Sequence, residues 1–121
     1  MVSVRYIVSD VAACVDFYHA RLGFKVEMHP GPGFAALSRG NLHLFLNAPG
    51  AGSAGKAGGS PEPGGWNRFQ IETDDLDGLI SRLSEDGAVF RGEIATGRGG
   101  RQILLEDPSG NVVELFEPAG S

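Results

Sequence analysis

The stretch Leu105-Glu106-Asp107-Pro108-Ser109-Gly110-Asn111-Val112-Val113-Glu114-Leu115-Phe116 places a polar turn between two apolar runs. This pattern predicts a β-hairpin that carries Glu114 on its second strand. A weaker copy occurs earlier, where Ser38-Arg39-Gly40-Asn41 leads into Leu42-His43-Leu44-Phe45-Leu46. Aligning the two Gly-Asn turns places Leu44 opposite Glu114. The chain therefore looks like two versions of one module that differ in chemistry at the same point.

The elements before each hairpin repeat in the same order. The first half shows an apolar strand over 4–8, a helix from its N-cap Asp10 to about residue 21, a strand over 24–28, and a hairpin over 34–37 and 42–46. The second half shows a strand over 69–73, a helix capped by Asp74-Asp75, and strands near 88–94, 102–106 and 112–117. Each copy is too short to close its own core, so we expect the two to pack through their sheets.

This order predicts an α+β fold made of two paired βαβββ modules. A single domain is expected over 1–121, with module one over 1–47 and module two over 66–118. The linker between them, residues 48–65, is rich in Gly, Ala, Pro and Ser and has almost nothing to bury. It either tethers the halves or forms a lid over a ligand cavity.

Composition excludes several classes of partner and location. The net charge is −5 and the basic residues are scattered, so neither nucleic acid nor an anionic membrane is an expected partner. The single cysteine, Cys14, cannot form an internal disulfide and fits a reducing compartment. No apolar run reaches the length of a membrane span, and no signal peptide precedes Met1, so we expect a cytoplasmic protein.

Several motifs now form a recognisable series. Asp10, Phe17-Tyr18 and Leu22-Gly23-Phe24 resemble the first-module signature of the vicinal oxygen chelate superfamily, the glyoxalase/bleomycin resistance/dioxygenase proteins. Three later segments resemble the second module of that superfamily: Trp66-Asn67-Arg68-Phe69, Asp74-Asp75-Leu76 and Glu106-Asp107-Pro108-Ser109-Gly110-Asn111. The resemblance runs from Ser3 to Pro118. It implies a curved mixed sheet around a cavity and, commonly, a homodimer whose sheets enclose two such cavities. The fold hosts metal enzymes and metal-free drug binders alike.

The resemblance also implies where a metal would be held. Superfamily enzymes use one side chain from each module's first strand and one, usually Glu, from its last strand; the matching positions are Ser3, Arg68, Leu44 and Glu114. Only Glu114 is a plausible metal ligand, because leucine has no donor atom and an arginine cannot lose its proton to coordinate. An ion pair between Arg68 and Glu114 would fill the place of the metal. Alternatively, Arg68 points to solvent and Glu114 is a simple strand-end carboxylate.

The histidines do not complete a metal site. Strand alternation turns His43 away from the face that Leu44 and Glu114 share, although a register shift of one residue would reverse this. We therefore expect no cofactor, with a divalent metal as the alternative.

The strand alternation also predicts a ligand pocket. The face of Glu114 has a mostly apolar lining with a few polar groups, as small-molecule pockets do. Trp66 is expected at the rim of this pocket, where it either contacts the ligand or packs against the sheet after the linker. Aromatic rims suit flat, conjugated ligands, and Arg5, Arg68 or Arg101 could meet an anionic or carbonyl group. The predicted ligand-binding residues are Arg5, Phe34, Leu44, Leu46, Trp66, Arg68, Gln70, Gln102, Leu104, Glu114 and Phe116.

No nucleophile elbow or phosphate-binding loop accompanies this pocket, and we assign no catalytic residue. The leading hypothesis is a metal-free protein that sequesters a hydrophobic or aromatic small molecule, such as an antibiotic, and so resembles the bleomycin-resistance branch. The alternative is a metal-dependent lyase, isomerase or dioxygenase of the glyoxalase type. A third, weaker hypothesis is a cofactor-independent enzyme that uses Glu114 as a base.

Overall fold

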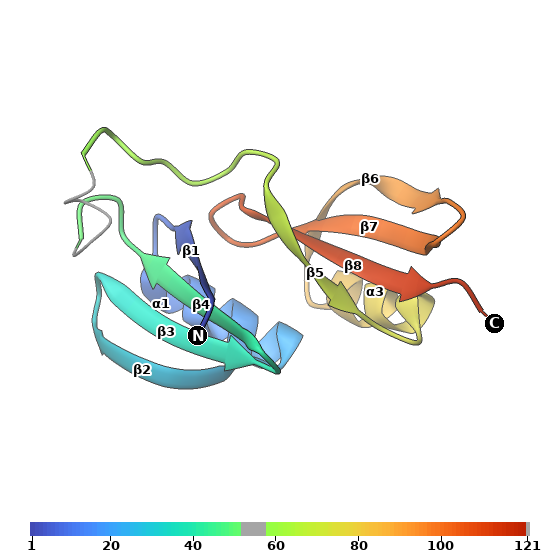
Figure 1. Ribbon diagram of the computed structural model, residues 1–121, viewed down its shortest axis with the longest axis horizontal. Coiled ribbons are helices and arrows are strands. Elements are labelled where there is room, and N and C mark those ends of the chain that lie inside the picture. Colours follow the sequence, from blue (N-terminus) through green and yellow to red (C-terminus); the bar gives the residue numbers. More distant parts are fainter. Residues whose placement is uncertain (52–57, 121) are drawn as a thin grey trace. The chain divides into compact units, whose positions relative to one another are not determined.

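The computed structural model describes residues 1–51 and 58–120. It divides the chain into two compact units, Met1–Gly64 and Gly65–Ser121. Within the described residues, each unit contains a four-stranded mixed sheet with helical structure against one face (Figure 1). The α+β fold of two βαβββ modules is therefore confirmed. Residues 52–57 of the predicted linker lie outside the described residues, so its role as tether or lid stays a prediction.

The first unit has its elements in the predicted order: β1 (Ser3–Ile7), α1 (Val11–Asp16), η1 (Phe17–Arg21), β2 (Lys25–Gly31), β3 (Phe34–Arg39) and β4 (Leu42–Asn47). The strand order across the sheet is β1-β4-β3-β2. β1 runs parallel to β4, and the other neighbours are antiparallel. The crossover from β1 through the helix to the rest of the sheet leaves β2 at one edge.

The first helix changes character halfway along. The Asp10 side chain accepts a hydrogen bond from the Ala13 amide at 3.0 Å, which is the predicted N-cap. After one and a half turns the α-helix continues as the π-helix η1. The Phe24 amide then donates to the Tyr18 carbonyl at 3.0 Å, and the two rings meet edge to face at 5.4 Å. Gly23, with φ of 74°, makes the reversal between them.

The second strand is longer than predicted. It was expected to end at residue 28, before a Pro/Gly turn, but β2 runs to Gly31 and includes Pro30. Proline cannot donate a hydrogen bond to a neighbouring strand, so it is tolerated on an edge strand. Because β2 is that edge, the proline does not end it.

The second unit repeats the arrangement with β5 (Arg68–Glu72), α3 (Leu76–Glu85), β6 (Val89–Thr96), β7 (Gly100–Glu106) and β8 (Val112–Pro118). Its strand order is β5-β8-β7-β6, the same as in the first unit with β5 parallel to β8. The Gly97 amide donates to the Gly100 carbonyl at 2.9 Å in the turn between β6 and β7.

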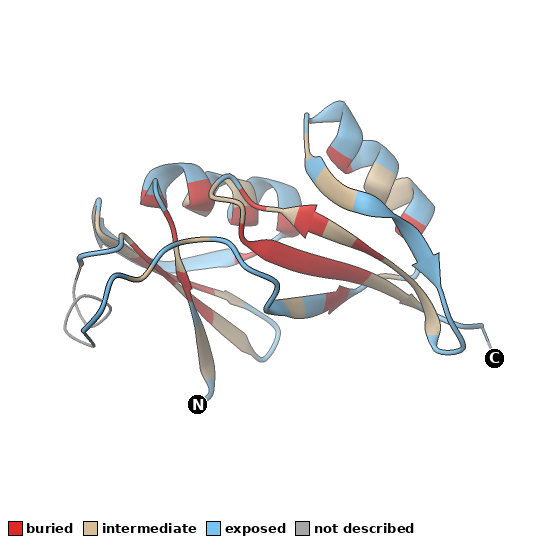
Figure 2. Cartoon of the chain, turned by 90° about the horizontal axis from the view of Figure 1, so that it is seen from above, coloured by how far each residue is buried: buried red, intermediate tan, exposed pale blue. Residues whose placement is uncertain are grey.

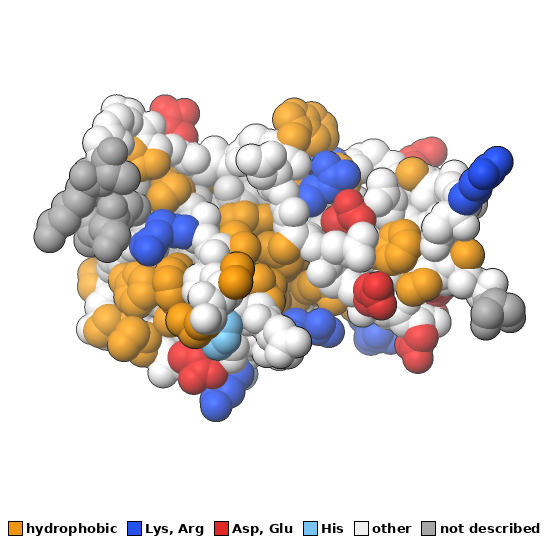
Figure 3. All heavy atoms as spheres, in the orientation of Figure 1, with side chains coloured by type: hydrophobic (Ala, Val, Ile, Leu, Met, Phe, Trp, Pro, Cys, Tyr) orange, Lys and Arg blue, Asp and Glu red, His pale blue; other side chains and the backbone are white. Residues whose placement is uncertain are grey.

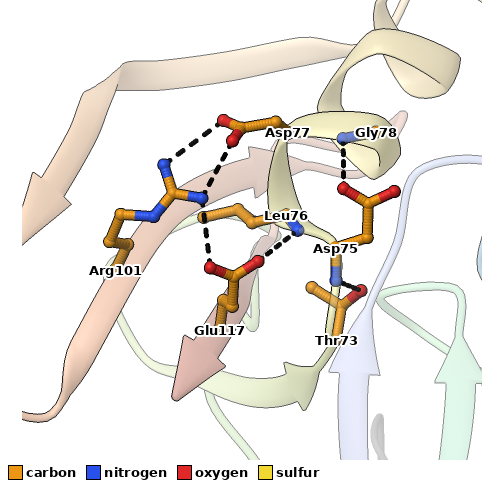
Figure 4. A network of polar contacts seen from close by, with 7 residues as sticks. All are labelled: Thr73, Asp75, Leu76, Asp77, Gly78, Arg101 and Glu117. Carbon is orange, nitrogen blue, oxygen red and sulfur yellow. Dashed lines mark hydrogen bonds and ion pairs between the residues drawn. The ribbon is translucent and has the colours of Figure 1, made fainter. Parts of the chain in front are cut away.

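Carboxylates fix the start of α3 to the sheet (Figure 4). Asp75 caps the helix by accepting from the Gly78 amide at 3.0 Å. Glu117 of β8 accepts from the Leu76 amide at 2.9 Å and from Arg101 of β7 at 3.1 Å. Arg101 also donates to Asp77 at 3.0 Å, and Asp77 followed by Glu117 raises the pKa of this guanidinium. This network ties the helix to two neighbouring strands.

The core of each unit lies between its sheet and its helix (Figure 2). α1 contacts β3 and β4, and α3 contacts β8. The residues buried on these faces include Tyr6, Val8, Tyr18, Leu37, Leu44 and Leu46 in the first unit and Ile71, Leu76, Leu83, Leu105, Val113 and Leu115 in the second. Among the described residues, no helix combines the length and the apolar character that crossing a membrane requires.

Candidate functional site

The sheet of the second unit keeps the face away from α3 open. Cross-strand partners share a face of a sheet, and side chains alternate along each strand. Gln70 pairs with Glu114, and Glu114 pairs in turn with Leu104. Steps of two residues along β5 and β8 extend this face to Arg68 and Phe116. The predicted members of the site in the second module therefore do lie on one face.

A carboxylate surrounded by N–H donors occupies the centre of this open face. The Glu114 side chain is 12% exposed, and Arg68 Nε donates to its Oε1 at 3.0 Å. Gln70 Nε2 donates to Oε2 at 2.7 Å. The Gln102 amide, in the orientation that satisfies its neighbours, donates to both oxygens at 2.9 and 3.2 Å. The predicted ion pair is thus confirmed, and both carboxylate oxygens are engaged.

A second arginine holds the corner where the linker enters β5. Arg91 Nε donates to Glu106 at 2.6 Å, and its other two nitrogens donate to the carbonyls of Gly65 at 2.7 Å and Gly110 at 2.9 Å. The Trp66 ring lies over this guanidinium at 4.6 Å while remaining 66% exposed. The Trp66 ring therefore packs on a charged group and not in the core.

A hollow of about 320 Å³ opens at the other end of the same face. Its walls are the Phe116 ring, the Gln102 side chain and the turn between β6 and β7, with Ala95, Thr96, Gly97, Gly99 and Gly100. A Cβ atom placed on Gly99 would lie 3.9 Å from Phe116, so larger side chains there would occupy the hollow. Gln102 joins the two features, because it both lines the hollow and donates to Glu114.

The open face of the first unit is aromatic with one exposed arginine. Arg5 pairs across the sheet with Phe45, and its guanidinium lies over that ring at 5.3 Å. Arg5 Nη1 donates to the Asn47 side chain at 2.7 Å. Phe34 lies 5.7 Å from Phe45, measured between ring centroids. In Figure 3 hydrophobic side chains gather over this sheet.

Two predicted ligand-binding residues, Leu44 and Leu46, lie on the other face. Both are fully buried, and their cross-strand partners on β1 are Val4 and Tyr6. Both leucines therefore lie in the core between the sheet and its helix, and the expectation that they line a pocket is wrong.

The error is one of register. Arg5 and Gln70 each precede their helix-capping aspartate by five residues, so they are equivalent positions. Arg5 pairs with Phe45, whereas Gln70 pairs with Glu114, and Phe45 is therefore the counterpart of Glu114. The two hairpins have turns of unequal length, closing at Arg39–Leu42 and at Glu106–Val112. Aligning their Gly-Asn turns shifted the first module by one residue.

The correction moves His43 to the open face, where it pairs with Ser3 and Ser38. Both partners are serines, whose hydroxyl groups are poor metal ligands. Among residues 1–51 and 58–120, no three His, Cys, Asp or Glu side chains lie together where they could hold a metal ion.

The donor set at the superfamily's metal positions does not fit a divalent cation. Phe45 offers no donor atom, and Ser3 offers only a hydroxyl. Arg68 carries a fixed positive charge and is bonded to Glu114, the single carboxylate of the set. A cation at Glu114 would have to displace the guanidinium and two amides from its oxygens.

Sequence reasoning missed Phe45, Asn47, Arg91 and Glu106 as parts of the two open faces. The first two followed from the register error. Arg91 lies on β6 and contacts residues 15 to 26 positions away in the sequence, and no local sequence pattern indicates such contacts. Arg101, which was considered for binding an anionic or carbonyl group, is instead engaged by Asp77 and Glu117 beside α3 (Figure 4).

Comparison with known proteins adds family information to this geometry. The sequence profile of the Glyoxalase/Bleomycin resistance protein/Dioxygenase superfamily matches residues 1–115. No curated protein matches the chain in sequence.

Among solved structures, TnmS3, an antibiotic binding protein from Streptomyces sp. CB03234, is 29% identical, with a TM-score of 0.74 and coverage of 97% of this chain and 93% of that one. A superfamily member from Sphaerobacter thermophilus DSM 20745 is 28% identical, with a TM-score of 0.75 and coverage of 95% and 94%. Lactoylglutathione lyase from Agrobacterium tumefaciens is 19% identical, with a TM-score of 0.76 and coverage of 97% and 92%, a likeness of fold.

Proposed function

Because the chain belongs to the glyoxalase/bleomycin resistance protein/dioxygenase superfamily, we propose that it uses this fold to bind and sequester a hydrophobic or aromatic small molecule without a metal ion. The single observation behind the proposal is the state of Glu114. Its two oxygens accept from Arg68, Gln70 and Gln102, so the carboxylate at the superfamily's metal-ligand position is already neutralised by the protein. Binding by burial needs a shaped apolar surface and a few polar anchors, and no Lewis acid.

The open faces have the chemistry that such binding needs. Phe34 and Phe45 in the first unit, and Phe116 and Trp66 in the second, are aromatic groups placed beside arginine or amide side chains. Flat conjugated molecules stack on such rings with about 0.5–1.5 kcal/mol beyond simple burial. The ligand-binding set proposed from the structure keeps Arg5, Phe34, Trp66, Arg68, Gln70, Gln102, Leu104, Glu114 and Phe116, adds Phe45, and omits Leu44 and Leu46.

An antibiotic is the class of ligand that we place first. The 29% identical structure is an antibiotic binding protein, and the match covers nearly all of both chains. The alternative, a metal-dependent lyase of the glyoxalase type, is supported by likenesses of fold at 16–20% identity, among them that to lactoylglutathione lyase. In the cell, sequestration would lower the free concentration of a toxic compound, so expression in a sensitive host should raise its tolerance of the ligand.

Metal analysis tests the proposal most directly. The purified protein is soaked with Ni²⁺, Mn²⁺, Zn²⁺ or Fe²⁺, desalted, and analysed for metal, with the Glu114→Gln variant as the matched control. We expect far less than one metal per subunit in both proteins. One tightly held metal per subunit that is lost in the variant would contradict the proposal and favour an enzyme.

We also propose that the chain forms a homodimer, as the resemblance to the superfamily implies. Light scattering coupled to size exclusion would give the mass in solution. A mass of one 12.7 kDa chain at all concentrations would contradict the dimer.

A further inference from the structure

We infer that the open face of the second unit selects an electrically neutral ligand, whose carbonyl-type oxygen accepts from Arg68 while its apolar body lies in the hollow beside Phe116. This inference rests on the proposed binding function and specifies the chemical class of the ligand. It follows from three features of the face: an arginine nitrogen that is available as a donor, charged side chains that compensate one another, and a hollow on the same face.

The available donor is one nitrogen of Arg68. Its Nε donates to Glu114 at 3.0 Å, and its Nη1 donates to the Trp66 carbonyl at 3.3 Å. Within the described residues Nη2 has no protein partner, and the side chain is 30% exposed. The two bonded nitrogens fix the guanidinium plane, so the free N–H groups of Nη2 are pre-oriented for an acceptor on a ligand.

The charge balance disfavours ions of either sign. Arg68 is paired with Glu114, and the other arginine of this face, Arg91, is paired with Glu106 at 2.6 Å. Glu72, at the end of β5, adds a further negative charge to the face. An anion would therefore meet an arginine whose charge is already compensated, and would be repelled by the remaining carboxylate. A cation would find Glu114 and the half-buried Glu106 occupied by guanidinium groups, and could approach only the exposed Glu72, where solvent screens the attraction.

Arg68 pairs with Val112, four residues or about 13 Å before Phe116 along β8, but its guanidinium is bonded to Glu114, which lies closer to the hollow. Gln102 pairs across the sheet with Phe116, which follows Glu114 by two residues on the same face, about 7 Å along the strand. The volume of about 320 Å³ is at the small end of ligand pockets. A fused two-ring system is the size of apolar body that suits it, with its oxygen directed toward Arg68.

Four naphthalene probes test the inference because they share one ring system and differ in the substituent. They are 2-acetylnaphthalene, with a neutral carbonyl; 2-naphthoate, an anion; 2-naphthylmethylammonium, a cation; and 2-ethylnaphthalene, without an acceptor. Titrations of ¹⁵N-labelled protein follow the indole N–H of Trp66, the only tryptophan, and the side-chain amides of Gln70 and Gln102. We expect the ketone to bind about tenfold more tightly than either ion and at least about threefold more tightly than the hydrocarbon.

A charge-removing variant makes the test specific to Arg68. Glu114→Gln preserves the shape of the side chain and removes its charge, so the affinity of the anionic probe relative to that of the ketone should rise about tenfold. Glu106→Gln is the matched control, since it removes the same charge from the same face beside Arg91. Its effect on the anionic probe should stay within about twofold. Gly99→Leu, which fills the hollow, should weaken every probe.

The outcomes separate this inference from the proposed function. Tightest binding of naphthoate to the wild-type protein, or an equal gain in Glu106→Gln and Glu114→Gln, would overturn the neutral-ligand assignment and leave small-molecule binding intact. Full affinity of the ketone for Gly99→Leu would overturn the placement in the hollow. If no probe bound the wild-type protein up to its solubility limit, the assignment would fall together with the proposed function.

Discussion

Replacing Arg68 with methionine would show how much the ion pair at the centre of the second unit contributes to stability. A hydrogen bond to a charged group contributes about 1.5–3 kcal/mol. Arg68 is 30% exposed and Glu114 12% exposed, so solvent screens the pair in part and the lower end of the range applies. Gln70 and Gln102 still donate to the carboxylate in the variant, which limits the cost of leaving it buried. We expect Arg68→Met to lower the free energy of unfolding by about 1.5 kcal/mol.

Urea unfolding followed by far-ultraviolet circular dichroism measures this change, because Trp66 lies too close to Arg68 to be an independent probe. The control is the double variant Arg68→Met/Glu114→Leu, in which both charges disappear together. We expect the double variant to recover to within about 0.5 kcal/mol of the wild-type protein, since an apolar pair is often as stable as a buried ion pair. A single variant indistinguishable from wild type, or a double variant whose loss equals the sum of the two single losses, would refute this account of the pair.

Three further predictions follow from other parts of the structure. Leu44→Ala should cost about 3 kcal/mol in urea unfolding because the side chain is fully buried, and Phe45→Ala should cost clearly less; equal costs would contradict the register reported above. Gly100→Ala should destabilise by about 2 kcal/mol, because φ of 147° and the backbone of β8 leave no room for a Cβ, whereas alanine at the preceding glycine should be tolerated. The Ser38 hydroxyl, followed by Lys25, lowers the pKa of Glu27 from 4.5, so any stability it adds is present above that value and is lost as the pH falls through the lowered pKa; Ser38→Ala should bring the pKa observed by NMR back toward 4.5.

The fold could be predicted because its signals are local and occur twice. An aspartate before an apolar stripe marks the start of each helix, and in the structure Asp10 and Asp75 both accept from an amide three residues later. Strands of alternating character then follow in the same order in both halves. Agreement between cap, stripe and strand order at two places in one chain leaves few other topologies.

Register is harder to predict because strand periodicity is two, and a slip of one residue exchanges the two faces. In the second module the polar residues of β5, β7 and β8 marked the open face, and Arg68, Gln70, Gln102 and Glu114 do meet there. In the first module β4 reads Leu-His-Leu-Phe-Leu-Asn, which places three leucines on one face and a histidine, a phenylalanine and an asparagine on the other. This alternation favours the leucine face as the core, but aligning the two Gly-Asn turns assigned that face to the pocket. The pairing with β1, which is not local in sequence, agrees with the alternation and places Phe45 beside Arg5.

The register correction changes the residue at this position and leaves the argument about the metal unchanged. The position equivalent to Glu114 is Phe45, which is no more able to coordinate a cation than leucine is. At matching points of the two sheets, a guanidinium lies over an aromatic ring in the first unit and an amide donates to a carboxylate in the second. In each unit the side chain at this position is already in contact with a neighbouring side chain of the same sheet, through a cation–π contact in the first unit and through a hydrogen bond in the second. A metal would have to break the second arrangement and would gain no ligand from the first, and this supports the proposal that the protein binds its ligand through shape and hydrogen bonds.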